Sequence, residues 1–373
     1  MKLNKDKWKV VRIGDVCEDI FAGGDVPVHR FSKIKSDEYR FPIYSNGEKD
    51  DGLYGYTDIK KVTKPSLTIS ARGTIGYSVI REENFFPAVR LIVLIPNREF
   101  IGLMFLKYVI GIIKFASSGT SIPQLTVPMV KKYEIPLPPL EEQIQIASLF
   151  KSIEEAVEQV EGQERSLNEL LKALSNDLLK EKPRFGNLLS DENCRSIKFK
   201  QIADCIEQHD KLKKEVTRFI GLENIESGIL TIETWGDIEK GTTFTKKFSK
   251  GDVLFGKRRA YLKKVAVAEF DGICSGDILV FRAKEEVILP GLLPYYVAAE
   301  PFIQYAVTTS AGSLSPRTKW KDLAEFQLSI PDLNAQKRVL ELFQQFQTTI
   351  RQLKQQKMNL IALKHNLLGE VFG

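Results

Sequence analysis

The chain has 373 residues, of which 43% are hydrophobic and 27% are charged, and its formal net charge is +6. This length allows two or three domains with separate cores, and this composition is that of an ordinary globular protein. The sequence has no run of about 18 apolar residues, and its start lacks an apolar signal core, so we expect a cytoplasmic protein without a membrane partner. Four cysteines without CxxC spacing and only three histidines argue against a zinc site.

Residues 1–134 read as a first globular domain. Residues 1–131 contain 20 Lys and Arg against 14 Asp and Glu, so this segment is basic. Short β-rich runs, for example 66–70 and 90–95, are separated by Gly, Asn and Asp, and a helical patch follows at 101–113. The pattern predicts an α+β domain of normal size.

Residues 135–182 read as a long helix. Apolar residues alternate at spacings of three and four, which is typical of a coiled-coil seam, and Glu164 is the only interruption. The seam consists of Ile146, Phe150, Ile153, Val157, Val160, Leu167, Leu171, Leu174 and Leu178. The segment 132–182 is acidic, with 6 basic and 11 acidic residues.

The same order of elements then returns. Residues 183–327 predict a second α+β domain, with strands at 252–255 and 277–281 and helical residues at 291–306. Residues 328–373 predict a second long helix, which is basic and whose seam is interrupted by Lys357 and Lys364. That seam consists of Val339, Phe343, Phe346, Ile350, Leu353, Leu360, Leu367 and Val371. Opposite charge on the two helices favours their pairing.

An internal repeat relates the two halves at a distance of 193 residues. The run from Gly119 to Leu140 aligns without a gap to the run from Gly312 to Leu333, and Gln143 aligns to Gln336. We therefore expect the long helices to pair as an antiparallel coiled coil about a pseudo-twofold axis. Under this repeat Glu164 is equivalent to Lys357, and we predict that the two approach each other and set the register. The alternative is that both side chains extend to solvent.

Two kinds of loop in each domain carry candidate ligand contacts. A basic or Gly-rich turn follows a strand, and a small-residue loop at 117–126 or 310–319 precedes each long helix. Cationic and amide side chains beside closely approaching backbone suit phosphates and base edges. A solvated charge run and a helix cap are the alternatives. The candidate residues are Arg72, Thr74, Gln124, Thr126, Lys257, Arg258, Arg259, Tyr261, Arg317 and Lys319.

No motif of a known catalytic site is present. Residues 251–258 resemble a phosphate-binding loop, but Arg258 occupies the place of the Ser or Thr that binds magnesium. HExxH, GxSxG and EF-hand patterns are absent from the sequence. We therefore expect a protein that is not an enzyme.

The chain resembles a known family at three places. These are the helix start PLPPLEEQI at 136–144, its second copy at 331–336, and the run 251–277. Together they are similar to the DNA-specificity (S) subunit of type I restriction-modification systems. The resemblance implies two target recognition domains, at 1–134 and 183–327, each reading one half of a split target in double-stranded DNA. The helices at 135–182 and 328–373 would be conserved spacers that set the distance between the halves.

The resemblance also implies partners. Two methyltransferase (M) subunits, which carry S-adenosylmethionine and methylate adenine N6, would dock on the spacers, and restriction (R) subunits would join that core for cleavage. The chain itself would bind no cofactor. It departs from the pattern at its second helix start, which reads Pro-Asp-Leu-Asn-Ala-Gln, and in having a single Arg72 where the second domain has a basic triplet. A two-headed protein-interaction scaffold with a coiled-coil spacer is the alternative function.

Overall fold

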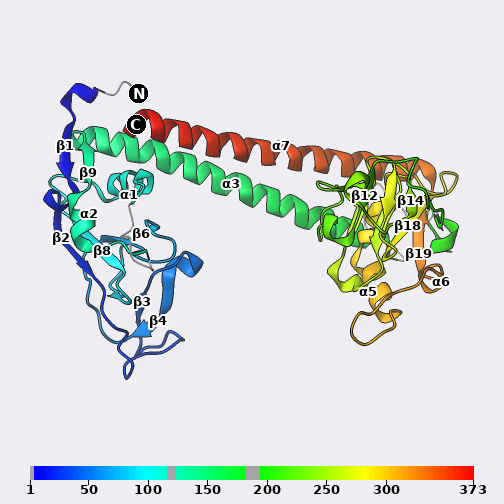
Figure 1. Ribbon diagram of the computed structural model, residues 1–373, viewed down its shortest axis with the longest axis horizontal. Coiled ribbons are helices and arrows are strands. Elements are labelled where there is room, and N and C mark those ends of the chain that lie inside the picture. Colours follow the sequence, from blue (N-terminus) through cyan, green and yellow to red (C-terminus); the bar gives the residue numbers. More distant parts are fainter. Residues whose placement is uncertain (1–3, 116–122, 181–193) are drawn as a thin grey trace. The chain divides into compact units, whose positions relative to one another are not determined.

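The computed structural model describes residues 4–115, 123–180 and 194–373. The chain divides into two compact units, of which unit 1 is Met1–Val160 with Gln356–Gly373 and unit 2 is Glu161–Gln355. Each unit joins a globular α+β body to part of two long helices, α3 (Leu140–Leu178) and α7 (Leu333–Phe372), which are green and red in Figure 1. The α+β fold class and the two long helices are thus confirmed. The four predicted segments, 1–134, 135–182, 183–327 and 328–373, divide the chain differently from these two units and stay a prediction.

In its described residues, the body of unit 1 contains three small sheets. A four-stranded sheet has the order β2-β8-β5-β6, a three-stranded sheet the order β4-β3-β7, and β1 pairs with β9. Helices α1 and α2 complete the body. The bounds are β1 Lys9–Arg12, β2 Cys17–Ala22, β3 Phe41–Tyr44, β4 Leu53–Thr57, β5 Ser66–Ile69, β6 Ser78–Arg81, β7 Phe86–Pro87, β8 Ile92–Pro96, α1 Leu103–Ile112, α2 Val127–Lys132 and β9 Glu134–Leu137.

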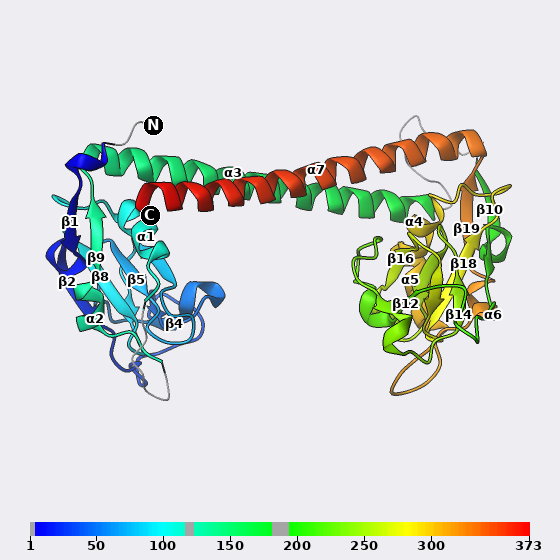
Figure 2. The same cartoon turned by 45° about the horizontal axis from the view of Figure 1, so that its top comes forward.

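The body of unit 2 has the same plan. Its sheets have the orders β11-β18-β15-β16 and β13-β12-β17-β14, and β10 pairs with β19. The bounds are β10 Cys194–Lys198, β11 Ala203–Cys205, β12 Arg218–Ile220, β13 Gly236–Asp237, β14 Lys246–Phe248, β15 Val253–Gly256, β16 Val265–Val267, β17 Gly272–Cys274, β18 Ile278–Ala283, α4 Leu293–Ala298, α5 Glu300–Thr308, α6 Trp320–Leu323 and β19 Gln327–Pro331. Figure 2 shows both bodies from a second direction.

One predicted helical patch is two helices. The residues 291–306 form α4 and α5, because Ala299 between them has an extended backbone, with φ −66° and ψ 143°. Pro301 follows in the first turn of α5, where its missing N–H costs nothing. The strand predictions at 66–70, 90–95, 252–255 and 277–281 are confirmed as β5, β8, β15 and β18 to within two residues at each end.

In unit 1 the two long helices run antiparallel. Lys364 Nζ donates to Glu154 Oε1 at 2.6 Å, and the rings of Phe150 and Phe372 stack with centroids 6.3 Å apart. Moving back along α3 from Glu154 therefore means moving forward along α7. Lys364, which interrupts the predicted seam, lies in the interface because it meets this carboxylate, and Lys107 and the Tyr108 hydroxyl also contact Glu154.

In unit 2 the helices pair through the predicted seam. Leu171, Leu174 and Leu178 share a hydrophobic core with Val339 and Phe343. All predicted seam residues of both helices are buried or half-buried, which confirms the apolar pattern as the contact face. Near the middle of α3, the Glu164 carboxylate lies 3.9 Å from Lys354 Nζ. The predicted approach of Glu164 to Lys357 joins residues of different units and stays a prediction.

Each long helix is attached to its body by a buried glutamine. Gln143 Nε2 donates to the Phe100 and Pro138 carbonyls, both at 2.9 Å, and its Oε1 accepts from Gly102 N at 2.9 Å. These three bonds satisfy the amide where water cannot reach it, since Gln143 is 1% exposed.

Gln336 makes the same set of bonds. Its Nε2 donates to the Val287 and Pro331 carbonyls at 2.9 Å, and its Oε1 accepts from Leu289 N at 2.8 Å. The altered second helix start has a local role as well, because Asp332 Oδ1 accepts from Ala335 N at 2.8 Å and so caps α7.

Candidate nucleic-acid interface

Three side chains from separate segments of unit 1 form a cluster, which we call the unit 1 cluster. Arg72 follows β5, Arg90 precedes β8, and Gln124 precedes α2. Arg72 Nε and Nη2 donate to Gln124 Oε1 at 3.2 and 2.7 Å, and Arg90 Nη1 donates to the same oxygen at 3.3 Å. Two guanidinium groups thus share one neutral acceptor.

Backbone hydrogen bonds position this cluster. Leu125 N donates to the Ala71 carbonyl at 2.9 Å, which fixes Gln124 beside Arg72. Asn46 links the segment of Arg72 to that of Arg90. Its Oδ1 accepts from Ala71 N and its Nδ2 donates to the Val89 carbonyl, both at 2.7 Å. Strands β5 and β8 are neighbours in the sheet, so the ends that carry the two arginines lie together.

Unit 2 contains a corresponding cluster, the unit 2 cluster, of Arg258, Asp277 and Arg317. Arg317 Nε donates to Asp277 Oδ1 at 2.8 Å and its Nη2 to Oδ2 at 3.3 Å, while Arg258 Nη1 donates to Oδ2 at 3.3 Å. Again two guanidinium groups share one acceptor, but here the acceptor is a carboxylate. Both arginine side chains remain about half exposed.

The backbone of unit 2 holds its cluster in the same manner. Thr318 N donates to the Lys257 carbonyl at 3.1 Å, and Lys257 N donates to the Asp277 carbonyl at 2.9 Å. Arg259 N donates to the Pro316 carbonyl at 2.8 Å, and Arg259 has a left-handed backbone with φ 54°. This conformation costs energy for a residue with a Cβ, and here it lets the turn after β15 meet the loop before α6.

The charges of the two clusters differ. The hydrogen bond from Arg317 holds the pKa of Asp277 below its ordinary value, against the opposing effect of partial burial, and the charges of Arg317, Arg258 and Lys257 add to it. Asp277 is therefore ionised at neutral pH, and the unit 2 cluster carries a net charge of one, whereas the unit 1 cluster carries two. Both present cationic fork-shaped donors, which suit phosphates and guanine edges.

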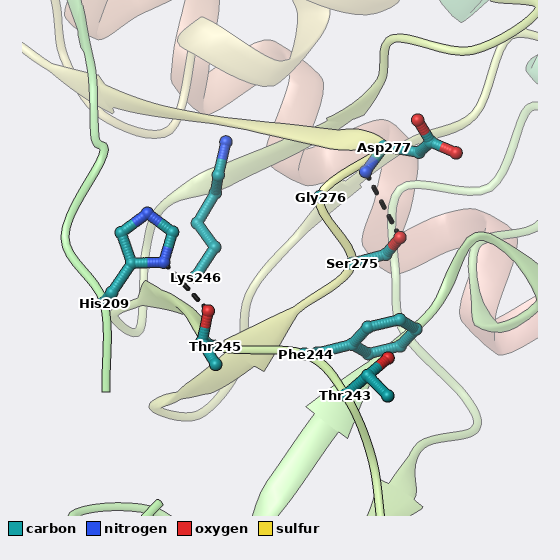
Figure 3. Close-up of a pocket in the computed structure, with 8 residues that line it drawn as sticks. All are labelled: His209, Thr243, Phe244, Thr245, Lys246, Ser275, Gly276 and Asp277. Carbon is teal, nitrogen blue, oxygen red and sulfur yellow. Dashed lines mark hydrogen bonds between the residues drawn. The ribbon is translucent and has the colours of Figure 1, made fainter. Parts of the chain in front are cut away.

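A recess in the surface adjoins the unit 2 cluster (Figure 3). Its lining consists of His209, Thr243, Phe244, Thr245, Lys246, Ser275, Gly276 and Asp277. His209 Nδ1 and Thr245 Oγ1 are 2.9 Å apart, and Asp277 N donates to Ser275 Oγ at 3.2 Å. In Figure 3 the Asp277 carboxylate points away from His209, so Asp277 contributes its backbone to the recess and its side chain to the arginines.

The other predicted contact residues lie outside the clusters. Thr74, Arg259, Tyr261 and Lys319 are exposed, and Lys257 and Thr126 are half-buried. Thr126 and Lys319 occupy equivalent places, because they are the N-cap residues of α2 and α6. Of the predicted loop 117–126, residues 117–122 lie outside the described part of the chain.

Helix capping, the structural alternative for the loop before the second long helix, accounts for part of it. Thr309 and Ser310 donate their hydroxyls to the Tyr305 and Ala306 carbonyls at 2.8 and 2.7 Å, and these bonds end α5. Capping does not account for Arg317, which belongs to the cluster.

Two cluster residues, Arg90 and Asp277, were not among the predicted contacts. Each is the first residue of a strand that the sequence predicts, at 90–95 and at 277–281. The feature that identifies them as cluster residues is the pairing register of the strands they precede. Ile69 pairs with Ile92 and Phe255 pairs with Leu279, so Arg90 and Asp277 each lie two residues before the paired strand residue.

Over the described residues, no group of three or more His, Cys, Asp and Glu side chains is placed to hold a metal ion. In the same part of the chain, no helix has the length and apolar character needed to cross a bilayer.

The chain belongs to the family of type I restriction modification DNA specificity domains. The family model matches twice, at residues 5–169 and 198–362, so the two matches are separated by the same 193 residues as the internal repeat. Each match contains all three residues of one of the two clusters.

Several relatives carry related names. The chain is 37% identical over 146 residues to the putative type I specificity subunit S.MpnORF89P of Mycoplasma pneumoniae, which is 39% of this chain and 43% of that protein. It is 20% identical over 399 residues to the type I restriction enzyme MjaVIII specificity subunit of Methanocaldococcus jannaschii, with 98% of this chain and 92% of that protein covered. The chain spans less than two thirds of the length of the first of these relatives.

Solved structures share the fold. A type I restriction-modification S subunit from M. genitalium superposes with a TM-score of 0.59 at 17% identity, covering 100% of this chain and 98% of that one. A second structure, described as a basis for complex assembly and conformational transition of the type I R-M system, superposes with a TM-score of 0.60 at 20% identity and covers 99% and 98% of the two chains.

Proposed function

We propose that this chain is the DNA-specificity subunit of a type I restriction-modification complex. Unit 1 and unit 2 would each read one half of a split target in double-stranded DNA. The observation that carries the proposal is the duplicated architecture, in which two bodies of one plan each bring a pair of arginines and one acceptor together at equivalent loops. A protein that reads two DNA segments needs two such surfaces, and arginine forks are the commonest readers of guanine.

The long helices support the spacer role. α3 and α7 have 39 and 40 residues, and at about 1.5 Å per residue each measures about 60 Å. The apolar seam and the Glu154–Lys364 pair resist sliding of one helix along the other within unit 1. A spacer of defined length suits a split target, because its two halves face the same side of the duplex only at certain separations.

The repeat also supports docking of two identical partners. Leu140 and its equivalent Leu333 are 39% and 40% exposed, and Leu170 and its equivalent Leu363 are 45% and 46% exposed. Apolar side chains left at equivalent exposure on both helices suit a partner that binds twice. We infer that these partners are two methyltransferase (M) subunits, and that restriction (R) subunits join that complex.

The chemistry would belong to those partners. We infer that this chain has no catalytic site and binds no cofactor, and that S-adenosylmethionine is held by the M subunits, which transfer its methyl group to adenine N6. We also infer a cytoplasmic location, because the DNA that such a complex would act on lies there.

The test is to co-express the chain with its neighbouring methyltransferase in a host that lacks N6-methyladenine, and then to sequence the host DNA for that modification. We expect methylation at one split motif, present with this chain and absent without it. The motif would give both half-sites and their spacing. An active methyltransferase whose methylation does not depend on this chain would contradict the proposal and favour the protein-interaction scaffold.

A further inference from the structure

Three positions in unit 1 have direct equivalents in unit 2. The β5–β8 register pairs Leu67 with Leu94, and the β15–β18 register pairs Val253 with Phe281. Matching these strand pairs makes Arg72 equivalent to Arg258 and Arg90 equivalent to Asp277. The sequence repeat makes Gln124 equivalent to Arg317.

A shared backbone bond confirms this matching. In unit 1, Leu125 N donates to the Ala71 carbonyl, and in unit 2, Thr318 N donates to the Lys257 carbonyl. Each donor directly follows the third position, and each acceptor directly precedes the first. The three positions therefore occupy the same place in both units.

The two units differ in which of the three positions holds the acceptor: the second and third positions have exchanged an arginine and an acceptor. In unit 1 the order is arginine, arginine, acceptor, and in unit 2 it is arginine, acceptor, arginine. Each unit keeps two guanidinium groups around one oxygen acceptor, while the acceptor moves from the loop before α2 to the start of β18. A cluster with a purely structural role would gain nothing from moving the acceptor to another position while keeping two arginines around it.

Within the described part of the chain, the arginines of both clusters keep N–H donors that a ligand can meet. Arg258 uses one N–H on Asp277, and Arg72 uses two on Gln124, of the five that each guanidinium carries. A guanidinium held by one edge is pre-organised, so less side-chain entropy is lost when its remaining edge meets a base. Guanine offers O6 and N7 in the major groove as a matching pair of acceptors.

We propose that these three positions determine which bases each unit reads. The position of the acceptor would set which part of the DNA half-site each arginine contacts. In unit 2, Asp277 is the positioning residue, because it holds both Arg258 and Arg317. This inference rests on the proposed function and deepens it, since it names the residues that distinguish the two half-sites.

The experiment is to give unit 2 the unit 1 order by the double substitution Asp277→Arg with Arg317→Gln in the full chain. The purified complex with its methyltransferase is tested on duplexes in which each base pair of both half-sites is replaced in turn. The measured quantity is discrimination, the ratio of Kd for the replaced and the original duplex. We expect discrimination to change by about tenfold or more at one or two positions of the unit 2 half-site and to stay constant throughout the unit 1 half-site.

The converse substitution provides an independent arm. Arg90→Asp with Gln124→Arg gives unit 1 the unit 2 order, and it should change only the unit 1 half-site. If one double variant fails to fold, as thermal unfolding would show, the other variant still decides. Asp277→Asn is a milder version, because it keeps an acceptor oxygen of the same shape and removes only the charge, and it should give a smaller change at the same positions.

Lys321→Ala, at an exposed position of α6 outside the predicted contacts, is the control for a nearby cationic side chain. It should weaken binding of all duplexes alike, if at all, and leave discrimination constant. Unchanged discrimination in a folded exchange variant would overturn the inference, and so would a uniform loss at all positions of both half-sites. In either case a chain-dependent split motif in the unsubstituted complex would leave the proposed function intact, whereas the absence of any such motif would remove the function itself.

Discussion

Gln143 and Gln336, which are 193 residues apart, make the same three backbone hydrogen bonds in their respective units. Each lies in the first turn of a long helix, and each binds a carbonyl before that helix and the backbone of a loop in its own body. The start of each long helix is therefore hydrogen-bonded to the body that contains the cluster of its unit. A rigid joint of this kind is what a spacer needs in order to fix the separation of two readers.

We predict that Gln336→Leu lowers the free energy of unfolding of unit 2 by about 2–4 kcal/mol, because Leu289 N and the Val287 and Pro331 carbonyls would lose their partner where water cannot replace it. Urea denaturation followed by circular dichroism measures the loss. Gln352→Leu, on an exposed face of α7, is the control and should change stability by less than about 0.5 kcal/mol. Equal effects of the two would show that the joint is not specific.

We predict that Arg258→Ala weakens binding to a DNA duplex that contains the split motif identified by methylation. The expected loss is about 1–3 kcal/mol if the Arg258 guanidinium reads a base. Asp277 would keep its stronger partner Arg317, so the fold of the cluster should survive. Fluorescence anisotropy on specific and scrambled duplexes, over a range of salt concentrations, measures the effect. A loss of equal size on both duplexes with a flatter salt dependence would instead make Arg258 a phosphate contact.

We predict that the pair between Glu154 and Lys364 makes the stability of unit 1 depend on pH. Partial burial raises the pKa of Glu154, but the hydrogen bond from Lys364 and the charges of Lys107 and Lys364 outweigh it, so the pKa lies below its ordinary value. A carboxyl whose pKa is lowered on folding stabilises the fold fully above its unfolded pKa of about 4.3, and this contribution disappears as the pH falls through the folded pKa.

Glu154→Gln should therefore lower the free energy of unfolding by about 1–2 kcal/mol at pH 7, and the difference from the unsubstituted chain should shrink toward pH 3. Urea denaturation at both values of pH provides the comparison. Glu155→Gln, one residue further along on an exposed position of α3, is the control. A difference that does not vary with pH would mean that Glu154 contributes through packing alone.

We predict that Leu170→Glu and Leu363→Glu, at the equivalent exposed positions of the two helices, each weaken association with the methyltransferase subunit by about tenfold or more. The fold should tolerate both changes, because these side chains already face solvent. Analytical ultracentrifugation of the mixed subunits measures how many methyltransferases bind. Met358→Arg, which introduces the residue found at the equivalent position Arg165, is the control and should leave both sites intact.

The periodic features were predictable because each depends only on residues close together in the sequence. The seam residues recur every three or four positions, and this spacing places them on one face of a helix whatever surrounds it. The two long helices, the main strands and the α+β class were recognisable for that reason. The break between α4 and α5 was missed, since an extended residue inside an apolar run leaves no periodic signal.

By itself the sequence determined the duplication and the pairing face of the helices, because both are patterns at constant spacing along the chain. Only the tertiary structure decided which polar residues meet. Arg72 and Arg258 are 186 residues apart, Arg90 and Asp277 are 187 apart, and Gln124 and Arg317 are 193 apart, so no single offset aligns the three pairs. The bodies differ in loop length, whereas hydrogen-bond register between strands is preserved, and that register is what brings each arginine to its acceptor.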